Sequence, residues 1–257
     1  MKIALIESKQ DEASVNLANI FRENHGKKLI LGSKILRLYS FNELHLGMNN
    51  LDLDADLYVF LSKHASKAGI DSLTVHSIGN FGENKFGGFK NKIVKTSSFW
   101  MKTYFQNLKA RNLDIEVAME ATHHGPYVEK SSMFVEIGSG KKAWKNKKYA
   151  ELIIETLIKT FKQDEKKIIP VFCIGGTHYC SSFLKIQDTT KYAISHVCPK
   201  YGLESLNNEL IKEVLEKSGS KVIIALDWDG LGREKQRVLS LLDKMNLEFV
   251  KTKFFRK

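Results

Sequence analysis

The feature that most constrains the fold is an alternation of short apolar runs with longer amphipathic ones along the whole chain. Short apolar runs between turn residues are typical of buried strands, and longer amphipathic runs are typical of helices. The apolar runs predict strands at residues 2–7, 36–39, 57–61, 72–75, 115–119, 133–137, 168–174, 192–197, 221–226 and 247–251. The amphipathic runs predict helices at residues 13–23, 97–113, 142–161, 203–217 and 232–245.

This alternation predicts an α/β fold with a mixed, mostly parallel sheet and helices on both faces. We expect the final short strands to pair antiparallel, which would make the sheet mixed. The chain has 257 residues, three prolines and no hinge-like stretch, so we expect a single domain over residues 1–257. No apolar run reaches the length of a membrane span, and the first residues turn polar too early for a secretory signal.

Composition narrows the compartment and the partners. Three cysteines, Cys173, Cys180 and Cys198, lack paired spacing and suggest a reducing, cytoplasmic environment. Forty Lys and Arg against 29 Asp and Glu give a net charge of +11. Such a surface attracts polyanions, among which nucleic acid is the commonest. The alternative is a solvated basic surface without a partner.

Six of the eight histidines lie at or just after the carboxyl end of a predicted strand. They are His64, His76, His123, His124, His178 and His196, and the carboxylates of Glu136 and Asp227 occupy similar positions. In open α/β sheets the carboxyl ends of the strands border the crevice that binds ligands. We therefore expect these side chains to share one cleft. His25 and His45 have no such placement.

The stretch MEATHHGP at residues 119–126 concentrates this chemistry, because it puts Glu120, Thr122, His123 and His124 ahead of a Gly-Pro turn. Imidazoles move protons near neutral pH and bind zinc, and a nearby carboxylate can orient them or act as a base. Adjacent side chains of an extended strand point to opposite faces, but a turn lifts that restriction. Standard zinc sequences such as HExxH are absent, so residue types alone leave metal binding open.

Two glycine pairs could bring backbone amides to a substrate. Gly138 and Gly140 lie between a predicted strand and a helix, where amides can meet a phosphate. Gly175 and Gly176, with Thr177, could polarise a carbonyl oxygen. A plain turn explains each pair equally well.

Together these residues resemble the D-aminoacyl-tRNA deacylases of the archaeal and plant type. The matching stretches are SKHAS at 62–66, LTVH at 73–76 with GN at 79–80, MEATHHGP at 119–126, FVEIGS at 134–139, GGTHY at 175–179, SHV at 195–197 with KY at 200–201, and LDW at 226–228. The chain departs from the family in Lys63, where arginine is usual, and at Cys180-Ser181-Ser182, where the family has a different run.

The resemblance implies a phosphorylase/hydrolase-like α/β fold similar to peptidyl-tRNA hydrolase, hydrolysis of the ester between a D-amino acid and tRNA, and zinc as cofactor. It implies tRNA charged with D-amino acids as the partner, and we expect the protein to act on it as a monomer. The residues that it points to for substrate binding are Ser62, Lys63, Ser66, Gly79, Asn80, Thr122, Gly138, Gly175, Gly176, Thr177, Tyr179, His196 and Lys200.

Two mechanisms follow for the remaining residues. In the first, His64, His123 and His178 hold zinc, whose bound water would be the nucleophile. In the second, without metal, His124 or His76 is the general base. Glu120 or Glu136 would be a base or an orienting group in either case. The sequence does not choose between them.

Two other classes of function fit the same composition. A nucleoside-phosphorylase-like enzyme would suit the implied fold, and a noncatalytic RNA-binding protein would suit the basic surface.

Overall fold

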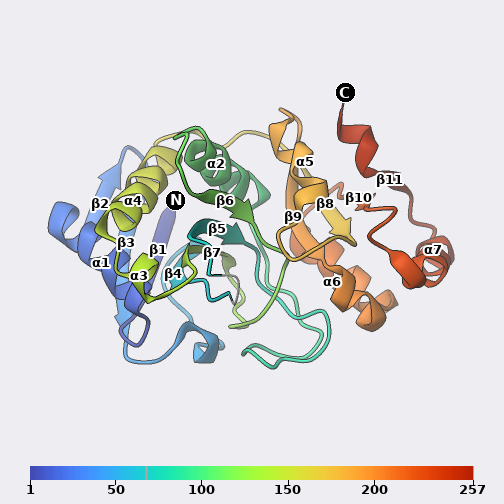
Figure 1. Ribbon diagram of the computed structural model, residues 1–257, viewed down its shortest axis with the longest axis horizontal. Coiled ribbons are helices and arrows are strands. Elements are labelled where there is room, and N and C mark those ends of the chain that lie inside the picture. The colour runs from blue at the N-terminus through green and yellow to red at the C-terminus, as the bar shows by residue number, and fades with distance from the viewer. Residues whose placement is uncertain (67–68, 257) are drawn as a thin grey trace.

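The computed structural model describes residues 1–66 and 69–256 (Figure 1). Its strands are β1 Lys2–Ser8, β2 Lys28–Leu31, β3 Lys34–Phe41, β4 Leu57–Lys63, β5 Ser72–His76, β6 Glu116–Met119, β7 Ser131–Gly138, β8 Ile169–Ile174, β9 Tyr192–Cys198, β10 Ile223–Leu226 and β11 Phe249–Lys251. Its α-helices are α1 Glu12–His25, α2 Ser98–Lys109, α3 Lys141–Trp144, α4 Lys147–Phe161, α5 Lys185–Asp188, α6 Asn208–Ser218 and α7 Lys235–Lys244. The predicted α/β class is confirmed.

Over the described residues the strands form two sheets, which lie side by side in Figure 1. The larger has seven strands in the order β2-β3-β1-β4-β7-β5-β6, and the smaller has four in the order β11-β10-β8-β9. Most neighbours are parallel, while β2 pairs antiparallel with β3 and β5 pairs antiparallel with β7. The predicted mixed sheet is therefore confirmed, but it is divided in two.

The predicted antiparallel pairing of the last strands is wrong, because β11 runs parallel to β10. Helix α7 lies between them in the chain and returns it to the starting end of the sheet, as a β-α-β crossover does. The strand β2 was missed because its apolar run, at residues 29–31, is only three residues long and lies half-exposed at the edge of the sheet. The predicted helix at 142–161 is broken into α3 and α4, since Asn146 caps the start of α4 through its side chain.

The hydrophobic core shows which faces the helices cover. One cluster joins α1, α2 and α4 to one face of the larger sheet through residues such as Leu5, Val59 and Val135, and it continues onto the smaller sheet through Val171. A second cluster packs α6 and α7 on the other face of the smaller sheet. Helices thus cover both faces of the smaller sheet, and the two sheets share a core.

The second face of the larger sheet has a different cover. Its apolar residues, such as Ile6 and Phe60, pack against residues of loops, among them Met48, Ile78 and Val128. Because loops and not helices cover this face, polar side chains of the loops can lie over it.

None of the described helices combines the length and apolarity that a bilayer span requires.

Candidate active site

The candidate site lies on this loop-covered face of the larger sheet. Glu136 on β7 is paired in register with Ser62 on β4, and Phe134 is paired with His76 on β5. Directly paired residues share a face, so these side chains project from the same side of the sheet. His64 continues the row, since its amide donates to the carbonyl of Ile137 at 2.9 Å beyond the end of β4.

The expectation of a common cleft holds for five of the six histidines and for Glu136, whereas His196 lies in the core and Asp227 accepts from the Gly230 amide away from the pocket. The geometry that brings the five together also differs from the expected one. Because β5 runs antiparallel to β7, the carboxyl ends of β4 and β5 lie at opposite ends of the sheet. The side chains gather over the face of the sheet, where alternation along each strand puts them on one side.

The MEATHHGP segment brings the two sheets together at the site. After β6 it runs past the smaller sheet, where the amide of Ala121 donates to the carbonyl of His178 at 2.7 Å. The amide of Thr122 donates to the carbonyl of Val197, and its hydroxyl accepts from the amide of Val197 at 2.9 Å. Thr122 is therefore buried and holds the segment against β9, while Ala121 holds the loop that carries His178.

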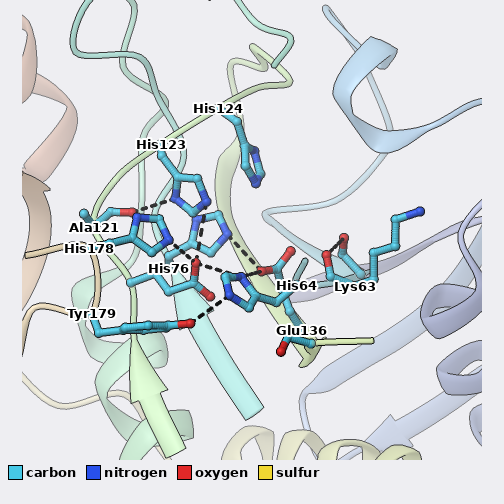
Figure 2. A network of polar contacts seen from close by, with 12 residues as sticks. Lys63, His64, His76, Ala121, His123, His124, Glu136, His178 and Tyr179 are labelled. Atoms are coloured by element: carbon cyan, nitrogen blue, oxygen red, sulfur yellow. Dashed lines mark hydrogen bonds and ion pairs between the residues drawn. The ribbon is translucent and has the colours of Figure 1, made fainter. Parts of the chain in front are cut away.

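Both histidines of the pair face the site. His124 has a φ of 46°, in the left-handed region, which turns the chain between the two rings. The rings of His123 and His124 lie 4.2 Å and 4.9 Å from that of His76, measured between centroids. Figure 2 shows His76, His123 and His178 facing one another, with His64 below them.

Glu120 lies at the centre of the cluster. Its Oε2 is 2.8 Å from Nε2 of His178, 3.1 Å from Nδ1 of His64 and 3.6 Å from Nε2 of His123. Burial would raise the pKa of this carboxyl, but hydrogen bonds from His178 and His64 hold it well below its usual value. Burial would lower the pKa of His64, but the carboxylates of Glu120 and Glu136 raise it to about 11.

Glu136 forms a second buried pair with His76, whose Nε2 lies 3.6 Å from the Glu136 Oε2. Burial would lower the pKa of His76, and the Glu136 carboxylate raises it. Burial would raise the pKa of Glu136, and His64 and His76 lower it. Both carboxyls are therefore held in the charged form by imidazoles.

His123 and His124 are held in a single tautomer. Nδ1 of His123 is 2.8 Å from the carbonyl oxygen of Ala121, and Nδ1 of His124 is 2.6 Å from that of Gly125. A carbonyl only accepts, so each Nδ1 carries the proton. Burial lowers the pKa of both rings, to about 4 for His124. At neutral pH each Nε2 therefore has a free lone pair.

A pocket of about 310 Å³ opens beside these groups. The predicted site residues that line it are Ser62, Lys63, His64, His123, His124, Glu136 and His178. His76 and Glu120 lie behind this wall, and Tyr179 is hydrogen-bonded through its hydroxyl to Nε2 of His64 at 3.0 Å. Ser66 lies just before the two residues that the structure does not describe.

The sequence missed the rest of the pocket lining, which consists of Asp11, Leu44, His45, Leu46, Ala65, Phe86 and Phe134. Asp11 gave a partial signal, since an acidic residue before a predicted helix is a typical cap, and it does accept from the amides of Ala13 and Ser14. Its other oxygen accepts from the Lys63 amide at 3.1 Å. His45, in a short 3₁₀ turn, gave none.

Four of the predicted binding residues lie elsewhere. Gly176, Thr177 and Lys200 line a separate groove that also includes Tyr201, whose hydroxyl lies 3.1 Å from Nδ1 of His178. The Gly175 amide donates to the carbonyl of Cys198 at 2.8 Å. That amide is therefore not free to polarise a substrate carbonyl, as the sequence had suggested.

His196 does not reach the pocket. Its Nε2 lies 2.9 Å from the carbonyl of Val94 and its Nδ1 lies 2.8 Å from the Ser218 hydroxyl, inside the core. The strand β9 runs on to Cys198, so His196 is a mid-strand residue and not the strand-end residue that the sequence suggested.

Burial of His196 predicts a pH effect on stability. It lowers the pKa of the ring from 6.5 to about 4, so the native state favours the neutral form. This contribution is complete above pH 6.5 and is lost as the pH falls towards 4, with a total of about 3 kcal/mol. We expect His196→Gln to flatten the pH dependence of the free energy of unfolding by about 1 kcal/mol per pH unit in that range. Urea unfolding of both proteins at several pH values measures it, and equal slopes would contradict it.

The predicted glycines and Asn80 shape the site without facing the pocket. A Cβ on Gly138 would lie 2.9 Å from Cδ2 of His64, so the glycine leaves room for that ring. Gly79 and Asn80 hold the loop at residues 79–90, because the Gly79 amide donates to the His124 carbonyl and the Asn80 side chain donates to that of Gly87.

Gly125 gives a sharp test of this packing. A Cβ there would lie 2.1 Å from the backbone nitrogen of Gly88, which nothing but backbone movement could relieve. We expect Gly125→Ala to lower the free energy of unfolding by about 2 kcal/mol and to reduce any activity of the site. Gly140→Ala is the matched control, because its Cβ would have no neighbour within 4 Å. Chemical denaturation compares them, and equal stability of the two variants would refute the packing argument.

The donor atoms fit a zinc ion. His64, Glu120 and His178 offer ligand atoms within 4.8 Å of one another, and so do His76, His123 and His124. Nε2 of His76 and Oε1 of Glu120 are buried without a hydrogen-bond partner among the described residues. Imidazoles and carboxylates are the ligands that zinc takes. The zinc ligands predicted from the sequence were His64, His123 and His178. In the structure Glu120 takes the place of His123, which groups with His76 and His124.

Comparisons with known proteins identify the family of the chain. The family model described as D-aminoacyl-tRNA deacylase matches residues 51–250. D-aminoacyl-tRNA deacylases from Picrophilus torridus and Thermococcus onnurineus are each 32% identical to the chain, over 96% and 98% of it and over 98% and 100% of their own lengths. A crystal structure of a conserved protein of unknown function superposes with a TM-score of 0.88 at 27% identity, covering 99% of this chain and 96% of that one. The chain therefore belongs to the D-aminoacyl-tRNA deacylase family.

Proposed function

We propose that the protein hydrolyses the ester between a D-amino acid and the 3′ end of tRNA, releasing free amino acid and tRNA. The observation that carries the proposal is the cluster of five histidines around two buried glutamates beside a pocket, in a chain of this family. The net charge of +11 supports a large polyanionic substrate.

His124 is the best-placed general base. Its Nδ1 proton is committed to the Gly125 carbonyl, so its Nε2 lone pair is available at the pocket wall. Nε2 takes a proton from a water molecule, whose oxygen attacks the ester carbonyl carbon. The bond from that carbon to the ribose oxygen then breaks, and the ribose hydroxyl leaves with a proton from His124. The negative charge of Glu136 stabilises the imidazolium formed in between.

Positive charge beside the carbonyl has two possible sources. Without metal it is the imidazolium of His64, paired with Glu120 and Glu136. With metal, His64, Glu120 and His178 would hold zinc, which polarises carbonyls and acidifies water. In both versions His76 and Glu136 remain a buried pair beside the histidines that line the pocket.

The test uses one tRNA charged with D-Tyr or with L-Tyr, incubated with the protein before and after chelation. We expect faster release of D-Tyr than of L-Tyr. Loss of activity on chelation and recovery with zinc, together with zinc found in the purified protein, would support the metal version, and full activity of metal-free protein would refute it. If neither ester is cleaved faster than in buffer, the proposed function is wrong.

A further inference from the structure

The pocket has a second half that the chemistry described above does not use. The apolar part of its lining comes from Leu44, Leu46, Phe86 and Phe134. Phe134 borders both halves, because its ring lies 4.8 Å from that of His124 and 5.1 Å from that of His76. A ligand whose reacting atom lies at the histidines would therefore place its neighbouring substituent against the apolar residues.

The apolar wall is built by two loops that are fixed to each other. The carbonyl of Leu46 packs so closely on Gly87 that a Cβ there would lie 2.1 Å from its oxygen. The amide of Gly125 donates to the carbonyl of Phe86 at 3.0 Å, which ties this loop to the segment of His124. The two apolar side chains at the rim are nevertheless open, at 40% exposure for Leu44 and 67% for Phe86.

The polar groups next to this wall are already engaged. One oxygen of Asp11 accepts from the amides at the start of α1, and the other accepts from the Ser62 hydroxyl and the Lys63 amide. His45 is buried, with its Nε2 at 3.2 Å from the Ile6 carbonyl. Both oxygens of Asp11 and the Nε2 of His45 are therefore taken and cannot bind a polar ligand group, whereas a hydrocarbon or aromatic group would lose only contact with water.

We propose that this apolar half binds the side chain of the esterified amino acid and makes large apolar residues the preferred substrates. The inference rests on the proposed function, since it needs the ester carbonyl to lie at the histidine wall. Wild type should then cleave D-Phe and D-Leu esters with kcat/KM at least tenfold above that for D-Ala or D-Asp on the same tRNA.

The test measures kcat/KM for D-Phe and D-Ala esters of one tRNA, so that contacts with RNA are constant. Phe86→Ala and Leu44→Ala should each lower the ratio of the D-Phe to the D-Ala value about fivefold to tenfold, and Phe86→Leu should restore part of it. Phe89→Ala is the matched control, because Phe89 lies in the same loop and packs on Tyr127 outside the pocket. Its ratio should stay within twofold of wild type.

An unchanged ratio in both Phe86→Ala and Leu44→Ala would overturn the proposed subsite, and so would a wild-type enzyme that cleaves all four esters equally well. Failure of the proposed function looks different, because wild type would then cleave none of the D-aminoacyl esters. Circular dichroism of each variant shows that the change in ratio comes from folded protein.

Discussion

His124→Gln is expected to lower kcat/KM for D-Tyr-tRNA by about a thousandfold while leaving the melting temperature within a few degrees of wild type. The reason is that glutamine fills the space but offers no nitrogen lone pair to accept a proton from water. The His124 ring makes one hydrogen bond through Nδ1 and packs on the rings of His76 and Phe134, and a glutamine of similar size keeps part of that packing while the base is lost. Single-turnover hydrolysis with saturating enzyme measures the chemical step directly.

His25→Gln is the matched control for this prediction. His25 ends α1 and contacts Phe21, outside the set of residues that line the pocket, so this variant should keep wild-type rates. A His124 variant that hydrolyses D-Tyr-tRNA at the wild-type rate would show that another group is the base. If the protein is a noncatalytic RNA-binding protein, the alternative from the sequence, both variants would bind tRNA equally well and neither would hydrolyse the aminoacyl ester.

Glu120→Gln is expected to remove both activity and stability. The buried carboxylate is the shared partner of His64 and His178, whose nitrogens lie 3.1 Å and 2.8 Å from its Oε2. Removing one member of a buried ion pair typically costs about 3 kcal/mol, and His64 would keep only its longer contact, 3.7 Å, to Glu136. We expect a loss of this size in the free energy of unfolding at pH 7, with at least a hundredfold loss in kcat/KM.

Glu155→Gln controls for the loss of one negative charge. Glu155 pairs with Arg111 on the exposed surface, where such pairs contribute at most about 1 kcal/mol. Urea unfolding of both variants gives the comparison. If Glu120→Gln proves as stable as Glu155→Gln, then Glu120 does not hold the histidine cluster together.

The sequence predicted the elements well because local periodicity dictates them, and it predicted the composition of the histidine wall because those residues follow apolar runs. Strand order and direction depend on contacts between distant segments, so the antiparallel pairing of β5 with β7 and the division into two sheets left no local trace. For the same reason His196, which the same rule selected, proved to lie in the core.

The apolar half of the pocket could not be predicted from the sequence either. Leu44 and Phe86 lie in loops, where a single apolar residue has no periodic pattern to mark it. Their meeting depends on backbone packing of Gly87 against Leu46, which only coordinates reveal. Clustered histidines stand out in a sequence because histidine is a rare residue, whereas the leucines and phenylalanines that shape a pocket are common residues.

The most direct test of a single composite site is a double-mutant cycle between His124, which follows the larger sheet, and His178, which follows the smaller one. The rates of D-Tyr-tRNA hydrolysis are compared for wild type, His124→Gln, His178→Gln and the double variant. Groups that act as one unit lose activity together, so we predict that the double variant is about as slow as the slower single variant. Losses that multiply would mean that the two histidines act independently, and would contradict the shared site.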